Sequence, residues 1–203
     1  MAVADKLRSE ILTGAIPPGT WLSQSELASR FGVSRIPVRD ALQQLASERL
    51  VELVPGKGAR AIEITQNELS QIFDLRILLE TDLLRHAMAV VPDTYYPEVR
   101  YALEKSSLEA GRAGWIEGDW FFHLTLYTPA RRQRQVAMIE ELRKTCVMYA
   151  ARYDALVDNT SRWLEDHEKI ACAYMERRVD DATDLMTRHI QGAHKFLNEG
   201  KAR

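Results

Sequence analysis

The chain has 203 residues, of which 46% are hydrophobic and 28% charged, and its formal net charge is −2. This length allows two small domains, each with its own core, and the composition is ordinary for a globular protein. No apolar run approaches the roughly 20 residues of a membrane-spanning helix, and the N-terminus lacks a signal-peptide pattern, so we expect a cytoplasmic protein without a membrane partner.

The N-terminal residues of the chain have the pattern of two helices. Apolar residues recur at positions 3, 7 and 11, which predicts a helix over 3–13 that ends at Gly14. After a Pro-Pro-Gly break, Ser23 and Glu26 form a capping box that begins a second, short helix. Gly32 follows this helix at the position where a left-handed residue terminates it.

A third helix follows Ser34, which can serve as its N-cap. Its apolar residues form one buried face, while Arg35, Arg39 and Gln43 share the other side. Two helices separated by a tight glycine turn, the second amphipathic and basic at its start, predict a helix-turn-helix. In such a motif the second helix enters the major groove N-terminus first, where arginines bond guanine edges or phosphates.

Two strand-like segments come next, at 50–54 and 59–64, joined by a Pro-Gly-Lys-Gly turn. A basic, glycine-rich hairpin after a recognition helix predicts a wing that reaches a phosphate or the minor groove. The net charge says little about DNA, but residues 30–60 carry six basic and only three acidic side chains. A local basic cluster is therefore compatible with DNA binding.

The residues of the predicted helix-turn-helix and wing resemble those of a known protein family. The core Ser34-Arg35-Ile36-Pro37-Val38-Arg39, within a match from Leu7 to Ile62, resembles the winged helix-turn-helix of the GntR family of bacterial regulators. There are two departures, because Ile36 stands where the family usually has threonine and Arg49 where glycine is usual.

The resemblance implies that Arg35 and Arg39 contact bases or phosphates of double-stranded DNA, whereas the alternative for any one of them is an ordinary solvated arginine. The full set that it implies for the DNA-binding face is Ser25, Ser34, Arg35, Arg39, Gly56 and Lys57, with the weakest case for Ser25.

The strand pattern stops near residue 64, so we expect a winged helix-turn-helix domain over 1–64 and a second domain over 65–203. Every long segment of the second domain has a helical pattern. The predicted helices are 66–90, 97–112, 116–127, 132–156, 161–178 and 181–198. Six helices with short connections predict an antiparallel all-helical bundle, which makes the chain mainly α.

Four residues of the second domain suggest a metal site. Asp119 and His123 lie four residues apart, on one helix face. His167 and His189 lie about 18 and 15 Å from the break between the last two helices, so they should stand side by side. A lone histidine on an apolar stripe is more often a hydrogen-bonded core residue. Three imidazoles and one carboxylate together suit zinc, nickel or manganese.

Residues 69–196 resemble the FCD ligand-binding domain of the FadR-type branch of the same family, and six helices indicate its shorter, VanR-like variety. Asp119 and His123 match the Asp-x-x-x-His pattern of that domain, and His167 and His189 match its two later histidines. The resemblance implies that these four residues hold a divalent metal that helps bind a carboxylate effector.

Arg76 lies on a predicted buried face, where a guanidinium needs an anionic partner. An internal carboxylate such as Asp119 or Glu80 is one alternative, and the resemblance favours the carboxylate of the effector. Tyr149 and Arg152, on the long fourth helix of the domain, complete the expected effector-binding set.

We therefore expect a homodimeric regulator that binds a pseudo-palindromic operator and whose affinity changes when a small carboxylate binds near the metal. One alternative makes the metal itself the signal. A metal-dependent hydrolase is the weaker alternative, since four protein ligands leave little room for a substrate and no separate base is evident. It would also leave the DNA-binding half without a role, so we expect no enzyme.

Overall fold

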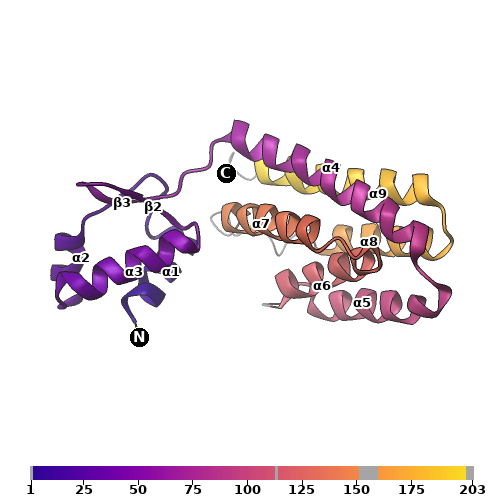
Figure 1. Ribbon diagram of the computed structural model, residues 1–203, viewed down its shortest axis with the longest axis horizontal. Helices are drawn as coiled ribbons and strands as arrows, with labels where there is room; N and C mark the ends of the chain where they lie inside the picture. Colours follow the sequence, from indigo (N-terminus) through magenta and orange to yellow (C-terminus); the bar gives the residue numbers. More distant parts are fainter. Residues whose placement is uncertain (1, 113, 151–159, 200–203) are drawn as a thin grey trace. The chain divides into compact units, whose positions relative to one another are not determined.

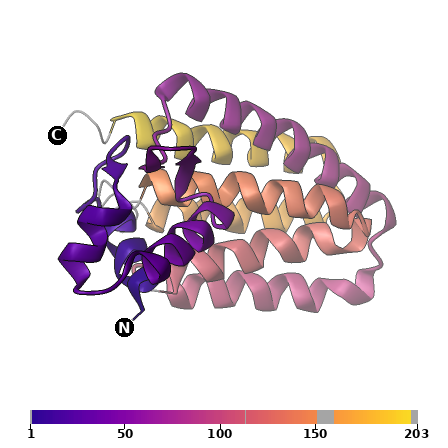
Figure 2. The ribbon, with the colours of Figure 1, turned by 60° about the vertical axis from the view of Figure 1, so that its left-hand side comes forward.

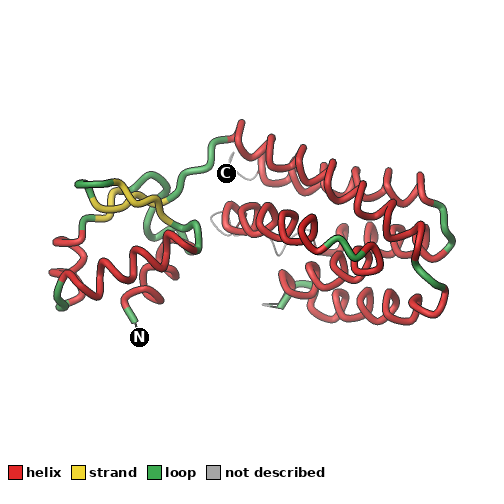
Figure 3. Tube along the Cα trace, in the orientation of Figure 1, coloured by secondary structure: helices red, strands yellow, loops and turns green. Residues whose placement is uncertain are grey.

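The computed structural model describes residues 2–112, 114–150 and 160–199. The chain divides into two compact units, Met1–Thr65 and Gln66–Arg203 (Figure 1). Strands occur only in the first unit among the described residues, and the second is helical (Figure 3). The fold class expected from the sequence is confirmed.

The first unit contains helices α1 (Val3–Leu12), α2 (Gln24–Phe31) and α3 (Arg35–Ser47). The predicted capping box begins α2, since the Glu26 amide donates to Ser23 Oγ at 3.5 Å. Gly32 ends α2 with φ +65°, the left-handed conformation that glycine adopts without steric cost. Ser34 occupies the N-cap position of α3, but its side chain makes no capping hydrogen bond, which corrects the capping role expected for it.

The wing is part of a three-stranded antiparallel sheet with strand order β1-β3-β2, formed by β1 (Trp21–Leu22), β2 (Val51–Val54) and β3 (Gly58–Ala61). The sequence predicted the β2–β3 hairpin but not β1, which pairs Leu22 with Ala59. Gly58 has φ +101°, and a Cβ there would lie 2.8 Å from the Leu22 carbonyl oxygen. Only glycine lets β1 approach the root of the hairpin this closely.

In the second unit, the described residues form six α-helices and two short 3-10 helices, η1 (Asp93–Tyr95) and η2 (Thr128–Ala130). The helices are α4 (Gln66–Val90), α5 (Tyr96–Glu109), α6 (Trp115–Tyr127), α7 (Gln133–Ala150), α8 (Thr160–Met175) and α9 (Val179–Glu199). Their bounds lie close to the predicted ones. The predicted continuation of the fourth helix of this unit to residue 156 falls outside the described residues.

Helices α4 and α9 run side by side, and α8 and α9 form a hairpin (Figures 1 and 2). Helix α6 packs against α5, and α4 also packs against α7. The interior is filled by fully buried aromatic and aliphatic side chains, among them Phe73, Phe122 and Tyr174. Within the described part of the chain, no helix combines the length and the apolar character needed to cross a bilayer.

Candidate functional site

A cluster of four potential metal ligands lies in the core of the helical unit. Helix α6 contributes Asp119 and His123, α8 contributes His167 and α9 contributes His189. One ligand atom from each lies within 4.8 Å of all the others. The three imidazole rings are buried, and their centroids are 5.0 to 5.2 Å apart. The four residues that the sequence grouped are therefore neighbours in space.

The geometry of the helices explains why these four side chains lie together. The spacing of four puts Asp119 and His123 on one face of α6, one turn apart. The α8–α9 hairpin brings His167 and His189 level, and their ring centroids are 5.0 Å apart, as its geometry predicts. Phe122 stacks on the ring of His167 at 4.3 Å and fixes its plane.

Each imidazole has a polar partner at Nδ1, on the side away from the cluster. His123 Nδ1 lies 3.2 Å from the Tyr127 hydroxyl, His167 Nδ1 lies 3.5 Å from Ser106 Oγ, and His189 Nδ1 lies 3.4 Å from Asp166 Oδ2. Outer partners of this kind orient metal-binding histidines and set their tautomers.

These outer partners dictate where the ring protons lie. The Tyr127 hydroxyl donates its only proton to Glu80 Oε2 at 2.7 Å, so it can only accept from His123 Nδ1. The Ser106 hydroxyl donates to the Leu103 carbonyl at 3.0 Å and likewise can only accept from His167.

The third imidazole obeys the same constraint, because the ionised Asp166 carboxylate can only accept from His189. A neutral imidazole carries one N–H, so the Nε2 atoms of His123 and His167 present lone pairs to the cluster.

The inner nitrogens of two of these rings are unsatisfied. His123 Nε2 and His167 Nε2 are buried and make no hydrogen bond. They lie 3.9 and 3.3 Å from Asp119 Oδ1 without hydrogen-bond geometry. Two lone pairs aimed at a carboxylate repel one another unless a cation lies between them. The donor set and its protonation therefore fit a divalent metal ion.

The ionisation states agree with this interpretation. Burial lowers the pKa of His123 well below its usual range, and the Arg143 guanidinium lowers it further. Burial also lowers the pKa of His167, against the opposing effect of Asp119. Burial alone would raise the pKa of Asp119, but Arg143 and the neighbouring imidazoles hold it well below the usual value. The cluster thus combines the neutral imidazoles of His123 and His167 with an ionised carboxylate.

Arg143 on α7 is a candidate site residue that the sequence did not predict. Its Nη2 donates to Asp119 Oδ2, and its Nη1 lies 3.6 Å from Glu80 Oε2 while making no hydrogen bond. The side chain is only 12% exposed and lies over the Trp120 ring. A signal was available, because Arg143 falls at helical spacing between the buried Ile139 and Cys146.

The residues predicted to hold an effector have different surroundings. Arg76 is buried, and its Nε donates to Glu80 Oε1 at 2.7 Å, which is one of the internal carboxylate partners considered above. Tyr149 is buried near the end of α7, one turn after the buried Cys146. Arg152 lies outside the described residues.

Glu80 connects several of these side chains. It is fully buried on α4 and accepts hydrogen bonds from Arg76 and Tyr127, with Arg143 close by. Burial alone would raise the pKa of Glu80, but the two guanidinium groups and the tyrosine hydroxyl lower it, so the carboxylate is ionised. A buried carboxylate with this many cationic and hydroxyl neighbours is sensitive to any change in their positions.

The residues predicted to contact DNA are arranged on the surface of the first unit. Arg35 and Arg39 are exposed in the first turns of α3, and the nearest carboxylate of Arg39 is Asp40 at 3.4 Å. Gly56 and Lys57 lie in the hairpin turn between β2 and β3, where Gly56 has φ +74°. Ser34 precedes α3 with an exposed side chain.

Ser25, the weakest of the predicted DNA contacts, is exposed at the start of α2, with its hydroxyl 2.9 Å from Ser23 Oγ. By contrast, Arg30 forms an ion pair with Glu10 of its own unit.

A helix-turn-helix with a wing, followed by a separate helical domain, defines a two-domain class of DNA-binding protein. Two family models match the chain: "Bacterial regulatory proteins, gntR family" over residues 1–60 and the "FCD domain" over residues 71–192. The chain belongs to the GntR family and carries an FCD domain.

Similar curated proteins agree. The HTH-type transcriptional repressor GlaR of Escherichia coli K12 is 30% identical over 195 residues, 91% of this chain and 89% of that protein. The gluconate operon transcriptional repressor of Bacillus subtilis 168 is 47% identical over 79 residues, which span 39% of this chain and only 32% of that repressor.

Solved structures share the fold. E. coli McbR/YncC has a TM-score of 0.69 at 22% identity, covering 97% of this chain and 95% of that chain. A GntR-family regulator from Pseudomonas syringae has a TM-score of 0.56 at 27% identity, covering 97% and 83%. The chain is a DNA-binding transcriptional regulator and not an enzyme.

Proposed function

We propose that this regulator is a metabolite sensor. Its operator affinity changes when a small carboxylate binds next to a divalent transition metal, zinc, nickel or manganese, held by Asp119, His123, His167 and His189. The single observation that supports the metal is the pair of buried imidazole nitrogens that face the Asp119 carboxylate with lone pairs and no hydrogen bond. A bound metal would supply a Lewis acid that attracts the carboxylate of the effector.

Arg143 is the residue whose contacts best support a role in binding the effector carboxylate. Its Nη1 is buried without a hydrogen bond, beside the metal ligands. A planar guanidinium binds a carboxylate with two parallel hydrogen bonds. Arg76 then has an indirect role through Glu80, whereas Tyr149 and Arg152 remain proposed neighbours of the effector.

Coupling to the DNA-binding unit would run through α4. This helix begins at Gln66, directly after the first unit, and carries Glu80. If an effector draws Arg143 toward itself, Glu80 loses a cationic neighbour and its hydrogen bonds to Arg76 and Tyr127 must readjust. Effector binding and DNA binding are then coupled through one conformational equilibrium.

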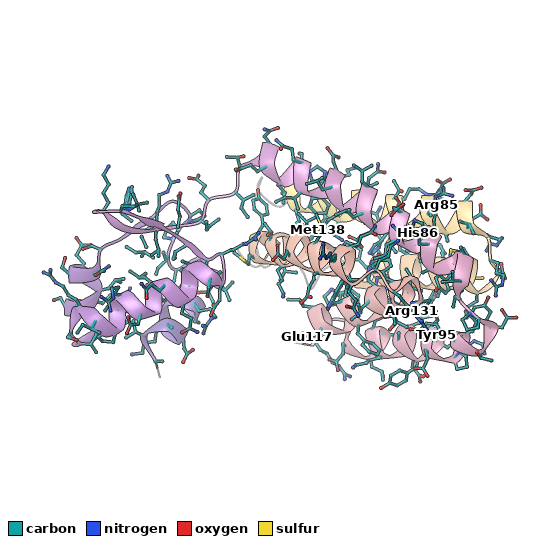
Figure 4. All side chains as sticks on the ribbon, viewed as in Figure 1. Arg85, His86, Tyr95, Glu117, Arg131 and Met138 are labelled. Carbon is teal, nitrogen blue, oxygen red and sulfur yellow. The ribbon has the colours of Figure 1, made fainter. Side chains whose placement is uncertain are left out.

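We also propose that the regulator is a homodimer in the cytoplasm, because two-fold symmetric proteins match pseudo-palindromic operators. Leu75 and Leu78 on α4 are 48% and 66% exposed. Met138, on the adjacent α7 and labelled in Figure 4, is 56% exposed. These apolar side chains on neighbouring helices suit contact with a second copy. Leu78→Glu should yield monomers in sedimentation velocity, whereas Leu108→Glu, at a similarly exposed leucine on α5, should not.

The effector proposal is tested with full-length protein of measured metal content and a DNA site selected by the protein from a random pool. A panel of small mono- and dicarboxylates is titrated while operator affinity is measured. At least one acid should change that affinity by about 5- to 150-fold, the usual range of allosteric coupling. Removing the metal with a chelator, or replacing Arg143 with glutamine, should abolish the response.

Two controls sharpen this test. Arg143→Lys keeps the charge but not the bidentate geometry and should retain a weakened response, while Arg100→Gln, at an exposed arginine on α5, should retain all of it. A panel without effect on operator affinity would contradict the metabolite sensor. If metal addition alone changed the affinity, the metal itself would be the signal.

A further inference from the structure

An apolar side chain lies on the DNA-reading helix where polar residues are expected. Ile36, in the first turn of α3, is 63% exposed. Among the large hydrophobic side chains described in the first unit it is the most exposed; Trp21, Leu53 and Val33 are 49%, 44% and 38% exposed. Single exposed apolar side chains are common on protein surfaces, so the significance of Ile36 depends on where it lies on the helix.

The position of Ile36 on the helix is specific. The buried face of α3 is formed by Val38, Ala41, Leu42 and Leu45. At 100° per residue, Ile36 and Gln43 lie directly opposite the middle of that face, with Arg39 and Asp40 on either side of them. Ile36 therefore occupies the centre of the outward face, at the end that enters the major groove first.

A structural role does not account for it. The residue before an N-cap often packs against the fourth helical residue, and here those positions belong to Val33 and the buried Val38. Ile36 is the second helical residue and takes no part in that pairing. Its neighbour Arg35 and the following Arg39 are both exposed, as expected of a surface that approaches phosphates and bases.

The major groove offers one apolar group to such a side chain. Of the four bases only thymine presents a methyl group there, and a branched aliphatic side chain at the helix tip can bury it. We propose that Ile36 is a specificity-determining residue that reads the C5-methyl of a thymine in each half of the operator. Arg35 and Arg39 position the helix on the duplex, and Ile36 adds a sequence preference that serine, which has no methyl group, would not supply.

The test uses the DNA site selected by the full-length protein from a random duplex pool. Each thymine of a half-site is replaced in turn by uracil, which removes only the methyl group, and the dissociation constants are measured at one fixed salt concentration. One symmetry-related thymine should show a loss of about fourfold per half-site, as expected for one buried methyl group.

Variants link the effect to the side chain. With Ile36→Ser the same uracil substitution should change nothing, with Ile36→Val the effect should persist, and with Val33→Thr, a matched exposed position one turn earlier, it should be unaltered. Equal uracil effects in the wild type and Ile36→Ser would overturn the proposal. A pool that yields no enriched sequence would instead contradict sequence-specific DNA recognition by the whole chain.

Discussion

The two units of this regulator place their functional side chains in opposite environments. In the DNA-binding unit, Arg35, Ile36 and Arg39 point outward from a small core and are free to meet a partner. In the helical unit, His123 and His167 are fully buried and hydrogen-bond to Tyr127 of α6 and Ser106 of α5. An exposed face can change its specificity with little cost in stability, whereas a buried polar cluster cannot change without affecting the fold.

The sharpest way to separate the two units is to remove the arginines of α3. Arg35→Ala combined with Arg39→Ala should weaken operator binding by about a hundredfold or more, because each arginine contact contributes roughly 1–3 kcal/mol. Metal content and thermal stability should not change, since both side chains are exposed. Arg100→Ala combined with Arg112→Ala, at two exposed arginines of the other unit, removes the same two charges and should bind DNA normally; a comparable loss there would indicate a general effect of charge.

The converse prediction concerns a substitution in the buried site of the helical unit. His167→Ala should lower the metal content from one ion per chain to none, as measured by elemental mass spectrometry of the purified protein. The unfolding free energy should fall by about 4 kcal/mol if the metal is present at a thousand times its dissociation constant. His86→Ala is the matched control, because His86 lies on the surface of α4 near Asp82 (Figure 4). A full metal complement in His167→Ala would refute the proposed ligand set.

The pH dependence of stability also distinguishes the two units. Burial lowers the folded-state pKa of His123 and His167 below 6.5, so below about pH 6.5 the unfolded chain binds protons that the folded chain does not. Stability of the metal-free protein is therefore lost as the pH falls, at about 1.4 kcal/mol per pH unit for each imidazole. Chemical denaturation between pH 7 and 5 measures this slope, and a flat profile would mean that the imidazoles are already charged.

The smallest effect concerns backbone strain in the DNA-binding unit. Arg49 adopts φ +57°, a left-handed conformation that is unfavourable for a residue with a Cβ. Arg49→Gly should stabilise the protein by about 1 kcal/mol, seen as a rise of a few degrees in the thermal midpoint. Arg49→Ala keeps the strain and serves as the control. If glycine lowered the midpoint, the contacts of the arginine side chain would outweigh the strain.

Much of the fold could be predicted because its signals are local. The capping box at Ser23, the Gly32 terminator and the alternating wing strands each depend on a few consecutive residues. Strand β1 was missed because Trp21 and Leu22 are too short to show alternation and pair with residues almost 40 positions later.

The same distinction applies to the buried site. The four proposed metal ligands could be grouped because two lie four apart on one helix and two face each other across one hairpin. For Arg76 the sequence favoured an effector carboxylate, with Asp119 or Glu80 as the internal alternative, whereas the structure pairs it with Glu80, one turn later on α4. Arg143 shows the same limit, because its role emerges only where several helices meet.

The close contact at Gly58 limits which parts of the wing can vary among relatives. Its close approach to the Leu22 carbonyl fixes the root of the hairpin, and the β2–β3 register ends with Val54 opposite Gly58. Only the three tip residues, 55–57, lie beyond that pair. Insertions should therefore accumulate at the tip, lengthening its reach over the duplex, while substitutions at Gly58 are purged. Natural variation in wing length, with an invariant root, is the evolutionary signature expected of this sheet.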